Sequence, residues 1–289
     1  AIMKYTAIAL SMTSLLALSA CDSGPQSSAP ASTEQGASIT LNKAVDHADR
    51  TPAYVQRDEF RHPQETLEFF GLEPSMTVVE IWPGGGYYSE ILAPYLADEG
   101  TFYAAHFPEN TNSDYYTRSL NKFKERLTSE AVFGNVELTQ FAPLTPLDTD
   151  IAPPNSADRV LTFRNLHNWY MNGGEEAVLS AFRQFHQALV PDGVLGVVDH
   201  RLPEGADDEA MANSGYIKES WVIDLAEQAG FEFVESSEIN ANPKDTADHP
   251  NGVWNLPPTL NVEDGDDTDI YKAIGESDRF TLKFRKPVQ

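Results

Sequence analysis

The 289-residue sequence contains only one cysteine, Cys21, so no disulfide can form within the chain and no cysteine-based metal cluster can be built. Basic residues are also scarce: 20 lysines and arginines stand against 44 aspartates and glutamates, a formal net charge of -24. Such a surface repels nucleic-acid phosphates, and no local basic patch interrupts it. We therefore expect no nucleic-acid substrate, and the ordinary consequence of the acidity is solubility.

The N-terminal apolar stretch is too short for a comfortable membrane span, which needs about 20 residues. It covers residues 5–20 (YTAIALSMTSLLALSA), follows Lys4, and has the charged start and short apolar segment of a signal peptide. It ends in Leu18-Ser19-Ala20-Cys21, which resembles a lipobox. We expect residues 1–20 to be a signal peptide and Cys21 to be the lipidation site. The alternative is an ordinary signal peptide with a chance cysteine.

Residues 22–40 (DSGPQSSAPASTEQGASIT) are rich in serine, alanine, proline and glycine and lack the apolar periodicity of a core. We interpret residues 21–41 as the lipidated cysteine followed by a flexible tether. This places the protein in the cell envelope, anchored to the membrane through its N-terminal lipid, on the periplasmic face. No break in composition follows, so residues 42–289 are expected to form one domain.

Strand patterns and helix patterns alternate along that domain. Short helices are expected first, at residues 41–50 and 64–70. Strands are expected at residues 77–81, 101–107, 136–141, 157–163, 194–199, 231–236 and 279–285, and helices at 87–96, 115–127, 175–189 and 218–229. This order predicts an α/β fold with a doubly wound, mainly parallel sheet of seven strands and helices on both faces. Ligands of such sheets bind at the carboxyl ends of the strands.

A glycine-rich turn joins the first of these strands to the helix at 87–96. Glu80 lies at the strand end, and Gly84, Gly85 and Gly86 form the turn. Glycine permits positive φ angles and close approach of a ligand to the backbone. A dinucleotide fingerprint would need glycine where Ser89 stands, and the Gly-Lys-Ser/Thr of a phosphate-binding loop is absent. The remaining alternatives are an adenosylmethionine-type pocket, another nucleotide site or a tight turn without a ligand.

The segment VEIWPGGG, residues 79–86, resembles motif I of class I S-adenosylmethionine (SAM)-dependent methyltransferases, with Trp82 in place of the first glycine. The segments HPQETLEFFGL, VVEIWPGGGYYSEILAPYL, LTFRNLHNWY and LVPDGVLGVVDHR resemble a bacterial family of predicted methyltransferases, many with signal peptides. The resemblance covers residues 45–286. It implies a Rossmann-like methyltransferase sheet under an N-terminal helical cover, and SAM as the cofactor. The cofactor-binding residues that it implies in this turn are Glu80, Trp82, Pro83, Gly84, Gly85 and Gly86.

The resemblance implies further cofactor contacts after the second, third and fourth strands. Class I methyltransferases usually end the second strand with an acid that binds the ribose, and His106 stands at that position. A neutral histidine can still hydrogen-bond a hydroxyl group. Asp148 is expected near the adenine, and Arg164 and Asn165 are expected to hold the methionine portion. Arg57, Arg61 and His62, in the leading helical segment, are candidates for the donor carboxylate.

Three residues are candidates for catalysis. His167 follows the fourth strand and can orient or deprotonate an acceptor, since histidine titrates near neutral pH. Asp199 and His200 follow the fifth strand and point to the same end of the sheet. The alternatives are that His167 packs and caps its loop and that Asp199 and His200 belong to a loop salt bridge. No metal-binding spacing connects the histidines, so no metal is expected.

The sequence therefore predicts a SAM-dependent methyltransferase that acts on a small molecule, with the acceptor and any protein partner unidentified. A lipoprotein folds outside the cytoplasm, where no supply of SAM is known, and this conflicts with the activity. Two other interpretations stay open. In the first, the protein is a former methyltransferase that now binds another small ligand. In the second, it acts through a protein partner in the cell envelope. Fold alone does not decide between them.

Overall fold

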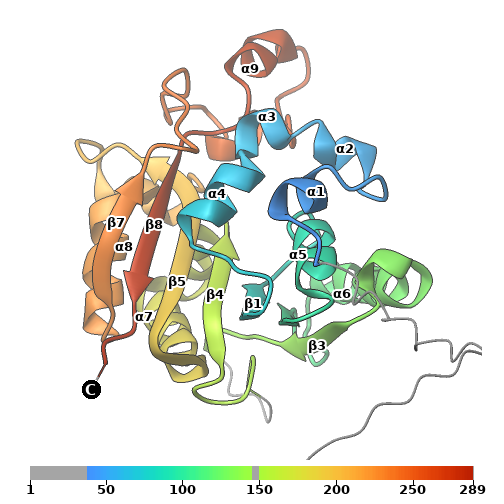
Figure 1. The fold of residues 1–289 in the computed structure, drawn as a ribbon. Coiled ribbons are helices and arrows are strands. Elements are labelled where there is room, and N and C mark those ends of the chain that lie inside the picture. Colours follow the sequence, from blue (N-terminus) through green and yellow to red (C-terminus); the bar gives the residue numbers. More distant parts are fainter. Residues whose placement is uncertain (1–37, 145–149, 289) are drawn as a thin grey trace, which may run out of the picture. The chain divides into compact units, whose positions relative to one another are not determined.

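A sheet of eight strands forms the centre of the computed structural model, which describes residues 38–144 and 150–288 (Figure 1). The segment from Ser38 onward is one compact unit. The predictions for the signal peptide, for the lipidation of Cys21 and for Asp148 lie outside the described residues. Within the described ranges, no helix combines the length and the apolar character needed to cross a bilayer.

Seven of the strands run in the order β3-β2-β1-β4-β5-β8-β7. Their bounds are β1 Thr77–Ile81, β2 Thr101–His106, β3 Val136–Gln140, β4 Ala157–Phe163, β5 Leu189–Leu202, β7 Glu232–Ser237 and β8 Arg279–Arg285. The strands from β3 to β5 pair in parallel, whereas β8 lies antiparallel between β5 and β7. The eighth strand, β6 (Ile217–Lys218), pairs with the end of β5. The prediction of a mainly parallel sheet is confirmed.

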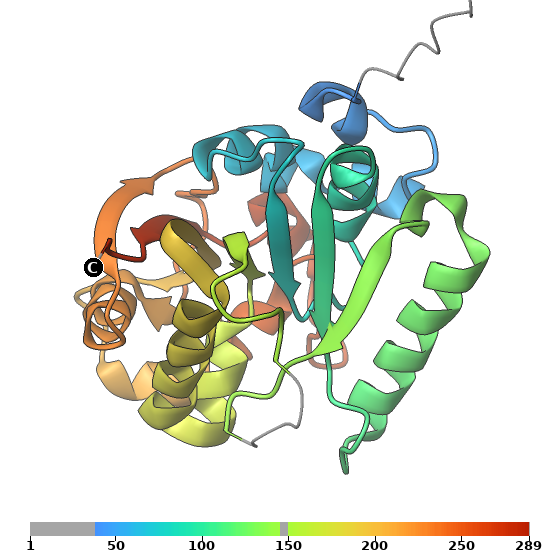
Figure 2. The same ribbon diagram turned by 60° about the horizontal axis from the view of Figure 1, so that its bottom comes forward.

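Helices cover both faces of the sheet. Their bounds are α1 Leu41–Val45, α2 Pro52–Val55, α3 Asp58–Arg61, α4 Pro63–Phe69, α5 Ser89–Leu96, α6 Asp114–Ser129, α7 Leu166–Ala188, α8 Glu219–Gln228 and α9 Thr268–Ile274. One hydrophobic cluster joins α7 and α8 to the sheet, and a second joins α1, α4 and α5 to it. Figures 1 and 2 both show α6 at the β3 end of the sheet. This is the doubly wound arrangement that the alternating pattern predicts.

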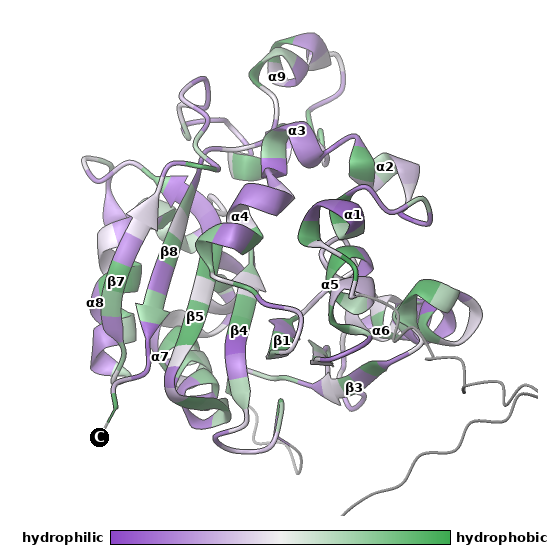
Figure 3. Ribbon diagram, in the orientation of Figure 1, coloured by the Kyte–Doolittle hydropathy of each residue, from purple (hydrophilic) through white to green (hydrophobic). Residues whose placement is uncertain are grey.

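Strand alternation assigns neighbouring residues to opposite cores. Val78 packs with the helices α4 and α5, while Val79 packs with α7. Leu161 and Val160 divide in the same way on β4. Because both faces are buried, these strands contain hydrophobic stretches, and Figure 3 shows such stretches in β4 and β5 beside hydrophilic residues. The polar residues of the site therefore gather where strands end.

Three elements differ from the prediction by several residues at one or both ends. The first helix ends at Val45, well before residue 50, and α7 begins at Leu166 because a turn of helix precedes a kink at Gly174 (φ 66°). The strand β5 is longer than residues 194–199, since it pairs with β4 on one side and with β8 on the other. Asp199 and His200 consequently lie within a paired strand instead of a loop.

The cover formed by α1 to α4 is attached to α5 and the glycine turn by polar contacts. Thr51 donates its backbone N–H and its hydroxyl to Glu90 on α5. Asp58 accepts hydrogen bonds from Arg50 and, at 2.5 Å, from the Tyr87 hydroxyl. These contacts hold the cover over the carboxyl ends of the strands, where the site lies.

Candidate functional site

The glycine turn has a left-handed backbone at three positions, with φ of 47° at Trp82, 59° at Gly84 and 93° at Gly86. A Cβ atom on Gly84 would meet open space, whereas one on Gly85 would collide with the Tyr54 hydroxyl. Gly86 is packed against α6, since Phe123 lies 3.3 Å from the position of a Cβ there. Only Gly84 therefore presents bare backbone to a ligand, and Gly85 and Gly86 serve packing.

A cavity of 530 Å³ lies over this turn, at the carboxyl ends of β1, β2 and β4. Its volume is within the range of small-molecule and cofactor sites. The wall consists of Tyr54, Arg57, Arg61, Trp82, Pro83, Gly84, Gly85, Tyr87, Phe107, Tyr115, Tyr116, Phe163, Arg164, Asn165, His167, Asn168 and Trp254. Of the predicted site residues, the turn residues 82–85, Arg164, Asn165 and His167 are thus brought together.

Glu80 supports the turn from beneath instead of lining the cavity. Its side chain is 2% exposed and accepts a 2.5 Å hydrogen bond from the Ser89 hydroxyl at the start of α5. Burial raises the pKa of this carboxyl to about 7, although the Ser89 hydrogen bond and the positive charge of Arg164 both oppose the rise. The buried acid therefore joins the end of β1 to the next helix.

Replacing Glu80 with glutamine is expected to stabilise the protein at alkaline pH. Because the folded pKa is raised, the carboxyl's contribution to stability is fully present below its usual pKa and is lost as pH rises through about 7. The free energy of unfolding of Glu80→Gln should exceed that of the wild type by about 3 kcal/mol at pH 8 and by little at pH 4.5. Urea titrations across this pH range measure the gap. Glu137 is exposed, so the free energy of unfolding of Glu137→Gln should not diverge from that of the wild type as pH rises. A difference between Glu80→Gln and the wild type that did not change with pH would contradict the raised pKa of Glu80.

His106 is fully buried beneath the turn, and both of its ring nitrogens are engaged by backbone groups. Nε2 lies 3.0 Å from the carbonyl oxygen of Gly84, and Nδ1 accepts the N–H of Phe107 at 2.8 Å. Burial lowers the pKa of the ring to about 4, so it is neutral and Nε2 carries the donated proton. Neither ring nitrogen of His106 is therefore free for the predicted contact with a ribose hydroxyl. The ring instead holds the backbone of the turn in place.

Trp82 turns its indole away from the glycines and into an aromatic cluster. Its Nε1 donates to the carbonyl oxygen of Phe141 at 2.9 Å, and its ring contacts those of Phe107, Tyr116 and Trp169. This cluster separates the main cavity from a second one of 410 Å³, and Trp82 and Tyr116 line both. The residue that replaces the first glycine of the motif is therefore an aromatic wall.

Asn165 and Arg164 follow β4 and face the main cavity. The Asn165 amide nitrogen donates to the carbonyl oxygen of Ile81 at 2.8 Å and to the Thr162 hydroxyl at 3.1 Å, which joins the ends of β1 and β4. The amide carbonyl is the atom left for a ligand. Arg164 has a left-handed backbone (φ 59°) and, among the described residues, its guanidinium forms no hydrogen bond or ion pair. Burial, together with Arg61 and Arg279, lowers its pKa to about 9.

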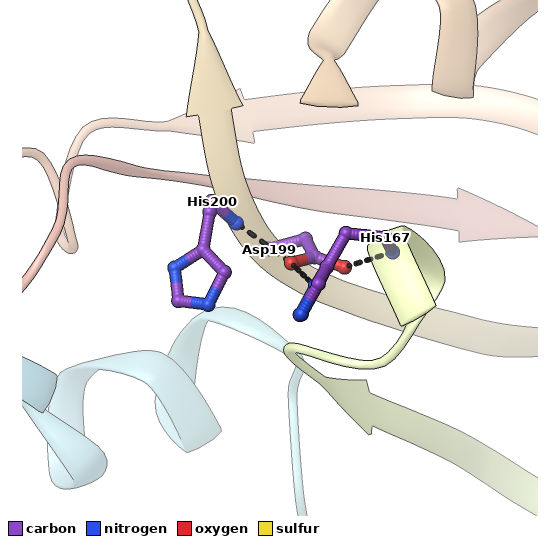
Figure 4. A group of neighbouring side chains, drawn as sticks. All are labelled: His167, Asp199 and His200. Atoms are coloured by element: carbon purple, nitrogen blue, oxygen red, sulfur yellow. Dashed lines mark hydrogen bonds and ion pairs between the residues drawn. The ribbon is translucent and has the colours of Figure 1, made fainter. Parts of the chain in front are cut away.

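His167 and Asp199 form a buried pair at the edge of the cavity (Figure 4). Asp199 Oδ1 lies 2.8 Å from His167 Nδ1, and Oδ2 accepts the backbone N–H of His167 at 3.2 Å in the first turn of α7. With the Nδ1 proton donated to the carboxylate, the lone pair on Nε2 belongs to a ring that lines the cavity. This is the arrangement of a general base with an orienting carboxylate.

His200 lies beside the pair, with its ring centroid 4.8 Å from that of His167. Its Nδ1 lies 2.5 Å from the Ser277 hydroxyl, and it is not part of the cavity wall. Burial lowers its pKa well below the usual range, with further lowering by His167 and nearby arginines. Although His167, Asp199 and His200 are close enough together to share a metal ion, Asp199 is already occupied by three N–H donors. The cluster is therefore suited to proton transfer rather than to a cation.

An ion-paired group closes the cavity on the side of the cover. Glu276 accepts from Arg61 at 2.8 Å and from Arg279 at 2.5 Å, and all three side chains are buried. Burial raises the pKa of Glu276, but Arg279 and Arg61 outweigh it and lower the pKa to about 2. Arg201, next to His200, instead pairs with Asp278, Glu219 and Glu238 outside the cavity. For Arg201, the salt-bridge alternative for residues 199–201 therefore describes the structure.

The tyrosine and tryptophan content suggests aromatic cavity walls, but the sequence did not identify which residues form them. Tyr54 comes from the cover, Tyr115 and Tyr116 from α6, and Trp254 from a segment near the C-terminus. Their spacing in the sequence carries no signal of a shared site, because only the fold brings these segments together. Aromatic residues are also more often core residues than ligand contacts.

No protein-family model and no curated protein matches the chain. Solved structures do resemble it. A SAM-dependent methyltransferase from Aquifex aeolicus is 17% identical, with a TM-score of 0.51 over 86% of this chain and 99% of the other. The chain has the fold of the class I SAM-dependent methyltransferases.

Two further structures bear out this fold. A protein from Galdieria sulphuraria, provisionally described as a sarcosine dimethylglycine methyltransferase, is 13% identical with a TM-score of 0.55, over 83% of this chain and 90% of the other. The [4+2]-cyclase SpnF is 17% identical with a TM-score of 0.52, over 86% and 92% of the two chains. Since one of these proteins is a cyclase, the chemistry of this chain must be argued from its own site.

Proposed function

We propose that the protein is a SAM-dependent methyltransferase that acts on a small molecule with an ionisable O–H or N–H group. The observation that carries this proposal is the His167–Asp199 pair, which lies at the wall of the same cavity as the bare backbone of Gly84. A base is useful in methyl transfer only when the acceptor must lose a proton. The pair thus favours an oxygen or nitrogen acceptor over one that is already nucleophilic.

The residues of the cavity fit SAM at its methionine end. Gly84 leaves open space where any other residue would place a Cβ, and this allows a ligand to contact the turn. The Asn165 carbonyl is available to an ammonium group, and Arg57 in the cover is available to a carboxylate, whereas Arg61 already pairs with Glu276. The aromatic wall at Trp82 suits a purine, whereas the usual acid for the ribose is replaced by the engaged His106. When bound, SAM supplies an electrophilic methyl group on a sulfonium.

The protein's own part in the reaction is alignment and removal of a proton. His167 Nε2 takes the acceptor proton, and Asp199 stabilises the imidazolium through Nδ1. Cover and aromatic walls exclude water and hold the acceptor in line with the transferred methyl group. Such positioning can lower the activation barrier by several kcal/mol, up to ~7–11 kcal/mol when the reacting groups are ideally placed. A change of the cavity wall therefore affects turnover even where no bond is made.

For the location, we propose that the protein is anchored to the cell envelope by a lipid on Cys21, as the lipobox resemblance implies. The methyltransferase proposal then requires SAM in that compartment. The alternative function is a methyltransferase fold without activity that binds another small ligand or a protein partner. The replacements at Trp82 and His106 favour this alternative, because both depart from the usual adenosine site.

Calorimetric titration with SAM and S-adenosylhomocysteine tests the proposal. We expect micromolar binding to the wild type, and Gly84→Ala should weaken it by roughly tenfold or more, because its methyl group enters the space that the ligand needs. Gly265→Ala is the matched control, since that glycine also has a positive φ and open space but lies outside the cavity. If a folded, monodisperse sample bound neither compound, the methyltransferase proposal would be wrong. The alternative, an inactive methyltransferase fold with another ligand or a protein partner, would then remain.

A further inference from the structure

The cavity is cationic although the chain carries a net charge of -24. Arg57, Arg61 and Arg164 line it, and no carboxylate of the described residues does. Behind the wall, Arg279 adds a fourth guanidinium, against the buried carboxyl groups of Glu276, Asp199 and Glu80 (each at most 2% exposed). An excess of positive charge collected in one concave site of an acidic protein indicates an anionic ligand.

Among the described residues, Arg57 and Arg164 are the cavity arginines that form no ion pair, and Arg164 is the one that lies three residues before His167. Arg61 and Arg279 share Glu276, whereas the Arg164 guanidinium has no hydrogen bond or ion pair within the described part of the chain. It is nevertheless partly buried, and its neighbours Arg61 and Arg279 repel it, which is why its pKa falls. An unpaired buried charge is costly, so such a group is kept where a ligand supplies the partner.

Arg164 follows β4, the strand between β1, which leads into the glycine turn, and β5, which carries Asp199 and His200. The sheet order β2-β1-β4-β5-β8 puts the glycine turn after β1, Arg164 after β4, and His200 and Arg279 on β5 and β8. The charges of Arg61, Arg279 and Glu276 act on that of Arg164, and the charge of Arg164 acts in turn on Glu80 beneath the glycine turn. His167 follows Arg164 by three residues. Arg164 therefore lies between the glycine turn and the base, where an acceptor would meet the donor's methyl group.

We propose that the acceptor is an anion, a small molecule with a carboxylate or phosphate group that pairs with Arg164 while its O–H or N–H group faces His167. This rests on the proposed function and changes one sequence prediction, since Arg164 was expected to hold the donor. SAM itself carries net positive charge, so its carboxylate alone does not neutralise the site. An anionic acceptor does, and it gives the bidentate contact that guanidinium groups favour.

The reaction on such an acceptor is balanced. The acceptor's O–H or N–H bond gives its proton to His167 Nε2, and the freed electron pair forms the new bond to the methyl carbon. The bond between that carbon and the donor sulfur breaks, and its electron pair stays on sulfur. The anionic group bound at Arg164 takes no part in these steps and serves recognition.

Binding of benzoate, benzamide and inorganic phosphate tests the proposal, by calorimetry on the protein alone and on the protein saturated with S-adenosylhomocysteine. We expect benzoate or phosphate to bind the saturated protein. The neutral benzamide should bind with an affinity at least roughly tenfold lower. Arg164→Met should lose the preference for the anions and keep its affinity for S-adenosylhomocysteine. The exposed Arg183→Met is the matched control and should behave as the wild type.

Thermal unfolding shows that the variant is folded: Arg164→Met should raise Tm, because it removes a repelled buried charge. Competition between the anions and S-adenosylhomocysteine would overturn the proposal, since Arg164 would then serve the donor carboxylate. Absence of anion binding, or anion binding unchanged in Arg164→Met, would also overturn it. Anion binding that needs Arg164 in a protein that does not bind S-adenosylhomocysteine would support the anion site and refute the methyltransferase.

Discussion

His167→Asn is expected to lower kcat by roughly 100- to 10,000-fold, the range of general-base catalysis, without weakening donor binding. His167 lines the cavity at the start of α7, and Asp199 fixes its ring through the 2.8 Å contact at Nδ1. Asparagine preserves polarity but offers no basic ring nitrogen to the acceptor. The measurement is the rate of S-adenosylhomocysteine formation with an acceptor found by screening, beside calorimetry with S-adenosylhomocysteine.

Asp199→Asn should also lower kcat, but for a different reason from His167→Asn. An amide that donates to Nδ1 would place the imidazole proton on Nε2, and this removes the lone pair that faces the cavity. The chain contains a matched control in His249, which pairs with the buried Asp245 at 2.7 Å outside the cavity wall. His249→Asn should retain kcat. If His167→Asn turned over at the wild-type rate, the pair would be a cap of α7 and not a base.

Glu276→Gln is expected to cost about 3–5 kcal/mol of the free energy of unfolding at neutral pH, the usual cost of removing one partner from a buried ion pair. The substitution leaves Arg61 and Arg279 buried without their shared carboxylate, and it removes the negative charge that offsets their repulsion with Arg164. Urea or guanidinium titration measures the loss. Glu238→Gln, which removes a more exposed partner of Arg201, should cost at most about 1 kcal/mol.

The pH dependence of this loss has a definite sign. Because the pKa of Glu276 is lowered to about 2, the carboxylate's contribution is fully present above its usual pKa and is lost as pH falls through about 2. The gap between wild type and Glu276→Gln should therefore be widest near neutral pH and narrow steadily in acid. A gap that stays constant down to the acid limit would show that the loss comes from packing rather than from charge.

The glycine turn shows how far the sequence goes toward the site. The run from Glu80 to Gly86 between a strand and a helix predicted the cavity's position, and the cavity lies there. The sequence did not show the role of each residue, because residues 82–85 line the cavity while Glu80 and Gly86 pack beneath it. The motif thus combines residues that face a ligand with residues that hold them in place.

His106 illustrates the reverse case. Its place at the end of β2 suggested a contact with the ribose, since that position usually carries an acid. The structure places the ring under the turn, bonded to Gly84 and Phe107, because a neutral imidazole with one donor and one acceptor satisfies two backbone groups there. Hydrogen-bond partners of a buried histidine depend on backbone geometry that sequence spacing does not contain.

The sequence by itself determined the α/β alternation, the mainly parallel sheet and the strand ends at which polar residues collect. These follow from local periodicity, which the 2- and 3.6-residue repeats record directly. Only the tertiary structure decided that β8 inserts antiparallel beside β5 and thereby brings Glu276 and Arg279 to Arg61, 215 residues from Glu276 in the chain. Charge pairing over such separations depends on which strands become neighbours, and that choice is made by the packing of the whole sheet.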